Sequence, residues 1–128
     1  MDRISIAKEW FEYTSRDISA SEFLMRMTPV PIEIICYHCQ QSAEKSLKAF
    51  LAYNSEVIPR VHDLTFLLEK CAAIDKSLKD LHDEALDLSD YSVVVRYPFA
   101  IDLNIEDARK AIKDAQRIKS TMGEKIHL

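Results

Sequence analysis

The segment that decides the fold is IEIICYHCQQSAEKSLKAFLAY, residues Ile32–Tyr53, and its pattern predicts one long helix. Apolar side chains recur at spacings of three and four residues, which places them on one stripe of an α-helix with 3.6 residues per turn. The stripe comprises Ile32, Ile35, Cys36, Cys39, Ala43, Leu47 and Phe50. We therefore expect this side of the helix to face the core.

The opposite side of the predicted helix mixes apolar, polar and charged side chains. It carries Ile34, Tyr37, His38, Gln41, Glu44, Lys45 and Lys48. Two interpretations are open. One is a solvated face on which Glu44 and Lys48 form an ordinary pair four residues apart. The other is an anion site, where the two lysines bind phosphate and where His38 and Gln41 contact a base or ribose.

Composition favours one all-α domain over residues 1–128. The hydrophobic content of 48% is enough for a single core. One glycine and four prolines are too few for the turns of a β-rich domain of this length. The net charge of −4 argues against a protein that coats nucleic acid, because such binding needs a surplus of Lys and Arg. Local positive charge could still serve one small anionic ligand.

Five helices are expected, joined by short connections that favour an up-and-down bundle of four long helices and one short helix. The first spans about residues 3–27 and ends before two prolines, and the second is the segment described above. A short third helix begins near Leu64, a fourth runs from about residue 77 to 97, and a fifth from about 105 to Gly123.

Capping residues mark where three of these helices begin. Asp63 or His62 is expected to cap the third helix, and Ser77 with Asp80 resembles a capping box for the fourth. The fifth helix has a cap signal in Asn104 followed by Asp107.

The cysteines and the N-terminus favour a cytoplasmic protein with reduced thiols. The first residues contain no hydrophobic run that resembles a signal peptide or a membrane span. Cys36 and Cys39 look like half of a zinc site, but a structural site needs two further ligands, and both cysteines fall on the apolar stripe. We therefore expect no metal, no cofactor and no membrane association.

Arg96, in the segment Arg96-Tyr97-Pro98, is a further candidate site residue. It projects from the same side of the predicted fourth helix as Leu78 and Ala85, so it points toward the bundle. A guanidinium in that position needs partners, and Asp17 of the first helix is the best candidate. Arg96 is either a structural ion-pair residue or a group placed at a cleft for phosphate or RNA.

The chain resembles the HEPN domains, helical-bundle proteins associated with nucleotide binding. The match includes the run CQQSAEKSLKA, residues 39–49, and its most specific signature is QSAEKSLKA, residues 41–49. Weaker matches occur in the expected order, and these are Trp10 with Asp17-Ile18, His62-Asp63-Leu64, and Arg96-Tyr97-Pro98. The resemblance implies a helical bundle, dimerisation, and partnership with a small separate nucleotidyltransferase.

Many HEPN proteins are metal-independent ribonucleases that use an Arg followed a few residues later by a His. The histidine transfers protons, and the arginine stabilises the negative charge that develops on phosphorus. Here YPFAIDLN follows Arg96 and contains no histidine. The resemblance therefore implies a noncatalytic protein that binds a nucleotide or RNA end and acts with a minimal nucleotidyltransferase in a toxin–antitoxin or defence-type system. The alternatives are a ribonuclease that combines Arg96 with His62, and an interaction module without a ligand.

A homodimer is the last expectation. Ile34 and Tyr37 lie opposite the core stripe, and apolar groups there need a cover that a symmetric partner would supply. Lys45 and Arg96 from both chains would then line one electropositive groove, with Tyr97 beside it.

Overall fold

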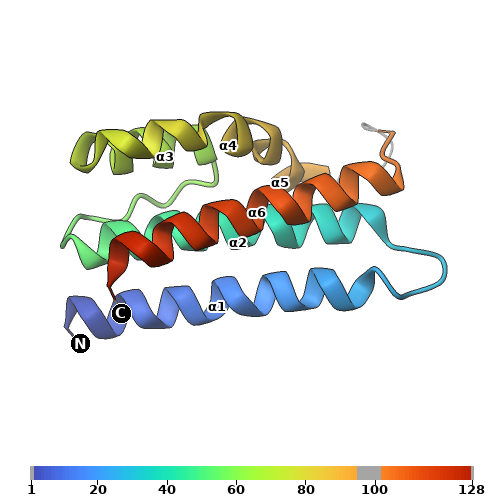
Figure 1. Cartoon of the computed structure of the whole chain (residues 1–128), viewed down its shortest axis with the longest axis horizontal. Helices are drawn as coiled ribbons and strands as arrows, with labels where there is room; N and C mark the ends of the chain where they lie inside the picture. The colour runs from blue at the N-terminus through green and yellow to red at the C-terminus, as the bar shows by residue number, and fades with distance from the viewer. Residues whose placement is uncertain (1, 95–101, 128) are drawn as a thin grey trace.

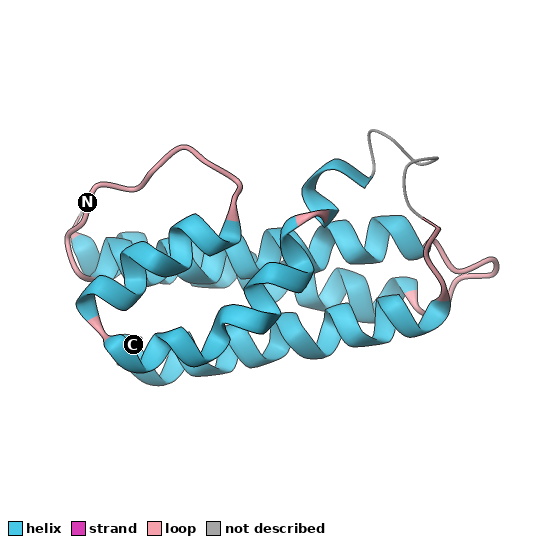
Figure 2. Ribbon diagram, turned by 90° about the horizontal axis from the view of Figure 1, so that it is seen from above, coloured by secondary structure: helices cyan, strands magenta, loops and turns pink. Residues whose placement is uncertain are grey.

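The computed structural model describes residues 2–94 and 102–127, and all the regular elements in these ranges are helical (Figure 1; Figure 2). Three helices are long, namely α1 (Arg3–Leu24), α2 (Ile32–Tyr53) and α6 (Ile105–Ile126). The shorter elements are α3 (Leu64–Ile74), the 3₁₀-helix η1 (Lys76–Leu81), α4 (His82–Ser89) and α5 (Tyr91–Val94). The predicted all-α fold class is confirmed.

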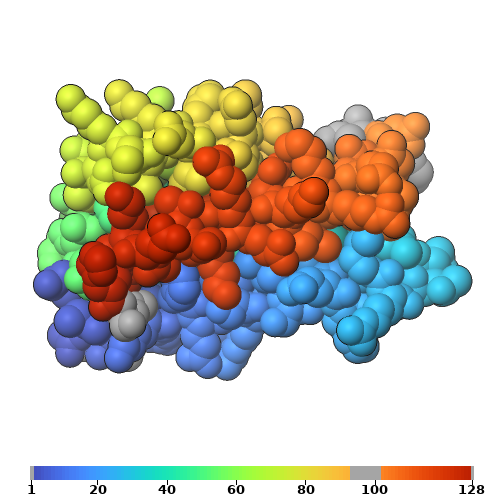
Figure 3. All heavy atoms as spheres, in the orientation of Figure 1, coloured from blue at the N-terminus to red at the C-terminus, as the bar shows by residue number. Residues whose placement is uncertain are grey.

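The long helices lie side by side, and α3 with the arm formed by η1 and α4 makes a further layer (Figure 1). On the face shown in Figure 3, α6 forms a band between this layer and α1. Helix α2 is central, because it packs against α1, α3, α4, α5 and α6. The expected stripe is confirmed, since Cys36, Cys39, Ala43, Leu47 and Phe50 are all buried.

The three cysteines behave as small core side chains. Cys36, Cys39 and Cys71 are free and buried, and burial raises the pKa of each thiol to about 12. These thiols therefore stay protonated at neutral pH and pack as small apolar groups.

The expected fourth helix is divided into η1, α4 and α5 instead of running without a break. The predicted capping box at Ser77 and Asp80 is wrong, because Asp75 makes the cap and accepts a hydrogen bond from the Ser77 backbone N–H. Further along, Ser89 Oγ donates to the Ala85 carbonyl, and Ser92 Oγ donates to the Ser89 carbonyl. Hydroxyls that bond to local backbone carbonyls weaken a continuous helix.

The other helix ends agree in part with the sequence. Asp63 caps α3, and the Asn104–Asp107 capping box of α6 is present. Helix α1 ends at Leu24, before the expected end near residue 27. Helix α6 continues past Gly123 to Ile126, and a Cβ at Gly123 would lie 3.2 Å from Phe11 Cζ. This glycine therefore permits close packing on α1 and does not end the helix. Within the described residues, no helix is both long and apolar enough to cross a membrane.

Candidate functional site

A seam of hydroxyl groups joins α1 to α2 and positions the site. Thr14, Ser42 and Ser46 are fully buried at this contact. Thr14 Oγ1 donates to the Ser42 carbonyl and lies 2.7 Å from Ser46 Oγ, while Ser42 Oγ donates to the Thr14 carbonyl at 3.1 Å. Small polar side chains let the two helices approach closely and still satisfy one another's hydrogen bonds.

One helical turn after Thr14, the carboxylate of Asp17 holds two side chains of α2. Its Oδ2 accepts a hydrogen bond from Lys45 Nζ at 2.7 Å, and its Oδ1 lies 3.0 Å from His38 Nδ1. Asp17 is buried, whereas the Lys45 and His38 side chains are 23% and 31% exposed. A buried carboxylate thus fixes an ammonium group and an imidazole at the surface. We call these three residues the Asp17 cluster.

A second carboxylate, Glu44, repeats this arrangement at greater depth. Its Oε2 accepts from Lys48 Nζ at 3.0 Å, and its Oε1 lies 2.8 Å from His62 Nδ1. The Glu44 and Lys48 side chains are only 6% and 8% exposed, whereas His62 is 67% exposed. Gln40 Nε2 also donates to the His62 carbonyl at 2.9 Å. The segment after α2 is therefore anchored to that helix.

The face of α2 opposite the apolar stripe differs from the expectation. Glu44 and Lys48 do form the predicted pair four residues apart, but a solvated face is wrong because α1 covers the pair. Lys48 Nζ lies 5.7 Å from the centre of the Trp10 ring, so its ammonium group is not presented at the surface beside Lys45. His38, Gln41 and Lys45 on this face are half-buried and remain open to a ligand, as does Tyr37, while Ile34 is exposed.

The remaining predicted site residues are Arg96, Tyr97 and Gln41. Arg96 and Tyr97 lie outside the described residues. Asp17, the expected partner of Arg96, uses both carboxylate oxygens for Lys45 and His38. Gln41 Nε2 donates to Gln40 Oε1 at 2.8 Å, so its own carbonyl oxygen remains available as an acceptor. In residues 2–94 and 102–127, no group of three or more His, Cys, Asp or Glu side chains could hold a metal ion.

Two residues of α1 that the sequence analysis did not single out, Tyr13 and Arg16, lie beside the Asp17 cluster. The Tyr13 ring is exposed, with Lys45 Nζ 5.8 Å and Arg16 Cζ 4.9 Å from its centre. Tyr13 also lines a hollow of about 260 Å³ with Ile6, Glu9 and Trp10. The spacing of Trp10, Tyr13 and Asp17 along α1 is a sequence signal for one shared face. It could not show which residues of α2 would meet that face.

The comparisons with known proteins agree with this architecture. A model of the HEPN domain matches residues 7–126. The chain belongs to the HEPN domain family. Among solved structures, TT1696 from Thermus thermophilus is similar, with a TM-score of 0.82 and 23% identity over 98% of this chain and 99% of that chain. ST0689, described as an archaeal HEPN homologue, has a TM-score of 0.73 and 24% identity over 94% and 97%. These two likenesses concern the fold, and no curated protein sequence matches the chain.

We expect Glu44→Ala to destabilise this HEPN domain by about 3 kcal/mol, because it leaves the Lys48 ammonium group buried without its carboxylate. The measurement is urea unfolding followed by circular dichroism. Glu12→Ala is a matched control, since Glu12 and Arg16 form an exposed pair at the same spacing, with Arg16 Nη2 and Glu12 Oε1 3.1 Å apart. Its loss should cost about 0.5 kcal/mol or less. Equal effects of the two variants would contradict the structural role of the buried pair.

Proposed function

We propose that this HEPN protein binds a nucleotide or an RNA end without cleaving it, and that it acts with a separate minimal nucleotidyltransferase. Membership of the HEPN family supports the class of ligand. The observation that carries the site is the Asp17 cluster, in which a buried carboxylate orients the half-buried side chains of Lys45 and His38. A cytoplasmic toxin–antitoxin or defence-type system is the proposed setting.

The Asp17 cluster has the chemistry for a phosphate group. An ammonium group has three N–H donors, and one of those of Lys45 is directed to Asp17, which leaves two for phosphate oxygens. His38 uses Nδ1 toward Asp17, so Nε2 is the nitrogen placed to meet the ligand. Because Asp17 fixes both groups in advance, ligand binding loses less side-chain entropy than it would with free lysines.

Tyr13 supplies the second half of the proposed site. Exposed aromatic rings stack with nucleobases whatever the base, and nearby cations strengthen such platforms. Tyr13 lies against both Lys45 and Arg16 and also lines the hollow beside Trp10. We therefore propose that the base lies over Tyr13 and that the phosphate contacts Lys45. Gln41 would add a hydrogen bond to the base or ribose, and Arg96 and Tyr97 are proposed to complete the site.

The proposed homodimer would cover apolar side chains at the end of the α1–α2 hairpin. Phe23, Met27 and Ile34 are exposed there, and Tyr37 lies one turn after Ile34. A two-fold interface uses one surface twice, so a single apolar patch can cover itself. In such a dimer, Lys45 and Arg96 of both chains would contribute to one groove.

A ribonuclease is the second candidate, and the geometry of His62 favours it over a pure interaction module. The buried Glu44 carboxylate orients the exposed His62 ring, which is an arrangement suited to proton transfer. Arg96 would have to supply the positive charge for the phosphorus centre.

Nucleotide binding tests the leading proposal. We expect Lys45→Ala to weaken AMP or ATP binding by about ten-fold or more, because a charge-assisted hydrogen bond contributes roughly 1.5–3 kcal/mol. Isothermal titration calorimetry measures the affinity, and Lys113→Ala, an exposed lysine on α6, is the matched control. Arg96→Ala should behave like Lys45→Ala. Unchanged affinity in both variants would remove the site.

RNA cleavage separates the two candidates. The purified protein should leave single-stranded RNA intact at neutral pH without metal, as judged by gel electrophoresis, because no histidine follows Arg96 at the family spacing. Cleavage that His62→Ala abolishes in a still folded protein would overturn the noncatalytic proposal and support the ribonuclease.

The oligomeric state tests the dimer. Sedimentation at micromolar concentration should give a dimer, and Ile34→Asp should produce monomers by placing a charge in the apolar interface. Val57→Asp is the control, since Val57 is exposed in the loop that follows α2. A wild-type protein that is only monomeric would eliminate the interface.

A further inference from the structure

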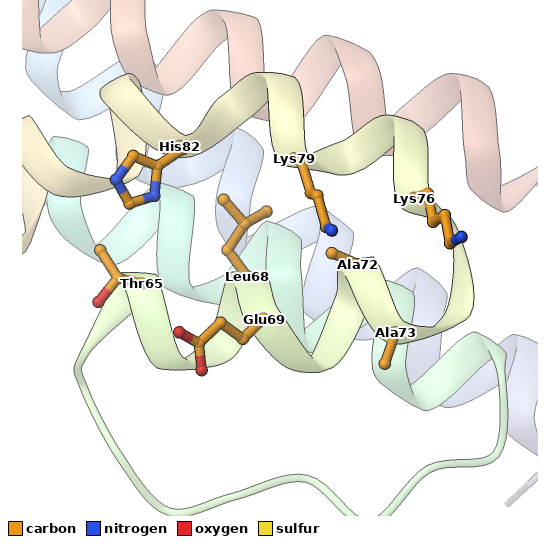
Figure 4. A pocket seen from close by; sticks show the side chains of 8 residues that line it. All are labelled: Thr65, Leu68, Glu69, Ala72, Ala73, Lys76, Lys79 and His82. Atoms are coloured by element: carbon orange, nitrogen blue, oxygen red, sulfur yellow. The ribbon is translucent and has the colours of Figure 1, made fainter.

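A cavity of about 450 Å³ lies between α3 and the arm, and neither the Asp17 cluster nor Glu44 contributes to it. Its volume falls in the range of small-molecule sites. Leu68, Ala72 and Ala73 of α3 provide an apolar floor, and Lys76, Lys79 and His82 of the arm form the opposite wall. In Figure 4, the Lys79 side chain extends from η1 toward α3 above this floor.

The acidic and the basic side chains of the arm lie on different sides of it. Three acidic residues in and beside the arm pair with cations of α6. Asp75 Oδ2 lies 2.8 Å from Lys125 Nζ, Asp87 Oδ2 lies 2.7 Å from Lys110 Nζ, and Glu84 pairs with Arg117. The exposed Asp80 and Asp83 do not line the cavity. The basic side chains of the arm are thus left facing the cavity, although the whole chain is acidic.

The lining also restricts the kind of anion. The floor is aliphatic, and the described lining residues include no Phe, Tyr or Trp side chain, so the His82 imidazole is the single ring in this lining on which a nucleobase could stack. Glu69 projects from α3 on the side opposite the lysines, which disfavours a ligand with several negative charges. Thr65, near His82, adds a hydroxyl group that can donate or accept a hydrogen bond.

We propose that this cavity binds a small amphipathic monocarboxylate with an aliphatic chain. The chain would cover Leu68, Ala72 and Ala73, and the carboxylate would accept hydrogen bonds from Lys76 and Lys79. This site is separate from the proposed nucleotide site, which lies between α1 and α2, so either one can fail without the other.

Calorimetric titration of the full chain with decanoate, below its micelle concentration, tests the proposal. Saturable binding is expected, and Lys79→Glu should lower the affinity at least ten-fold because it places a carboxylate where the ligand carboxylate binds. Lys79 is exposed, so the variant should fold, as circular dichroism would verify.

Three controls make the outcome decisive. Lys113→Glu, on α6, should keep the wild-type affinity, and nonyltrimethylammonium, which has the same nonyl chain with a cationic head, should not bind. Absence of saturable decanoate binding, or equal losses in Lys79→Glu and Lys113→Glu, would overturn the site. Equal binding of the cationic amphiphile would overturn the role of the lysines. AMP binding that depends on Lys79, without decanoate binding, would overturn the choice of ligand.

Discussion

The close contact between α1 and α2 is the constraint on which the polar half of the structure depends. Thr14, Ser42 and Ser46 are buried in this contact and satisfy their hydroxyl groups across it. Larger apolar side chains would separate the helices, and unpaired hydroxyls would cost the free energy of desolvation. The seam therefore fixes the register of the two helices. That register decides which side chains of α2 lie opposite Asp17.

The same combination of a carboxylate, a lysine and a histidine occurs twice, and burial gives the two sets different roles. The Glu44 carboxylate and the Lys48 ammonium group are shielded from water, so their mutual attraction has to offset a large desolvation cost. The pair therefore contributes more to a unique packing of the helices than to the net free energy of unfolding. It also holds His62 and the segment before α3. At Asp17 the lysine and histidine remain half-buried, where an incoming anion can compete for their donors. Depth in the bundle thus separates a structural pair from a candidate binding group.

Charge in this protein is organised locally, although its net value is −4. Helix α6 uses Lys110, Arg117 and Lys125 to neutralise acidic residues in and beside the arm, which ties these elements together. Lys76 and Lys79 on the other side of η1 are left facing a cavity. The net charge of the whole chain reveals neither the ion pairs with α6 nor the lysines at the cavity, because electrostatic interactions of exposed groups decay within about 10 Å at moderate ionic strength.

The sequence by itself determined the fold class, the central position of Ile32–Tyr53, its buried stripe and the cap at Asn104, and it narrowed the cap of α3 to Asp63 or His62. These features follow from periodicity and from hydrogen bonds between residues close in the chain, so local pattern is sufficient. Tertiary structure alone decided that Lys48 is buried, that Asp17 meets Lys45 and His38, and that Tyr13 joins them. It also decided that Gly123 faces Phe11 inside a continuing helix. A helical pattern defines the faces of one helix, but the neighbour of each face depends on packing between segments distant in sequence.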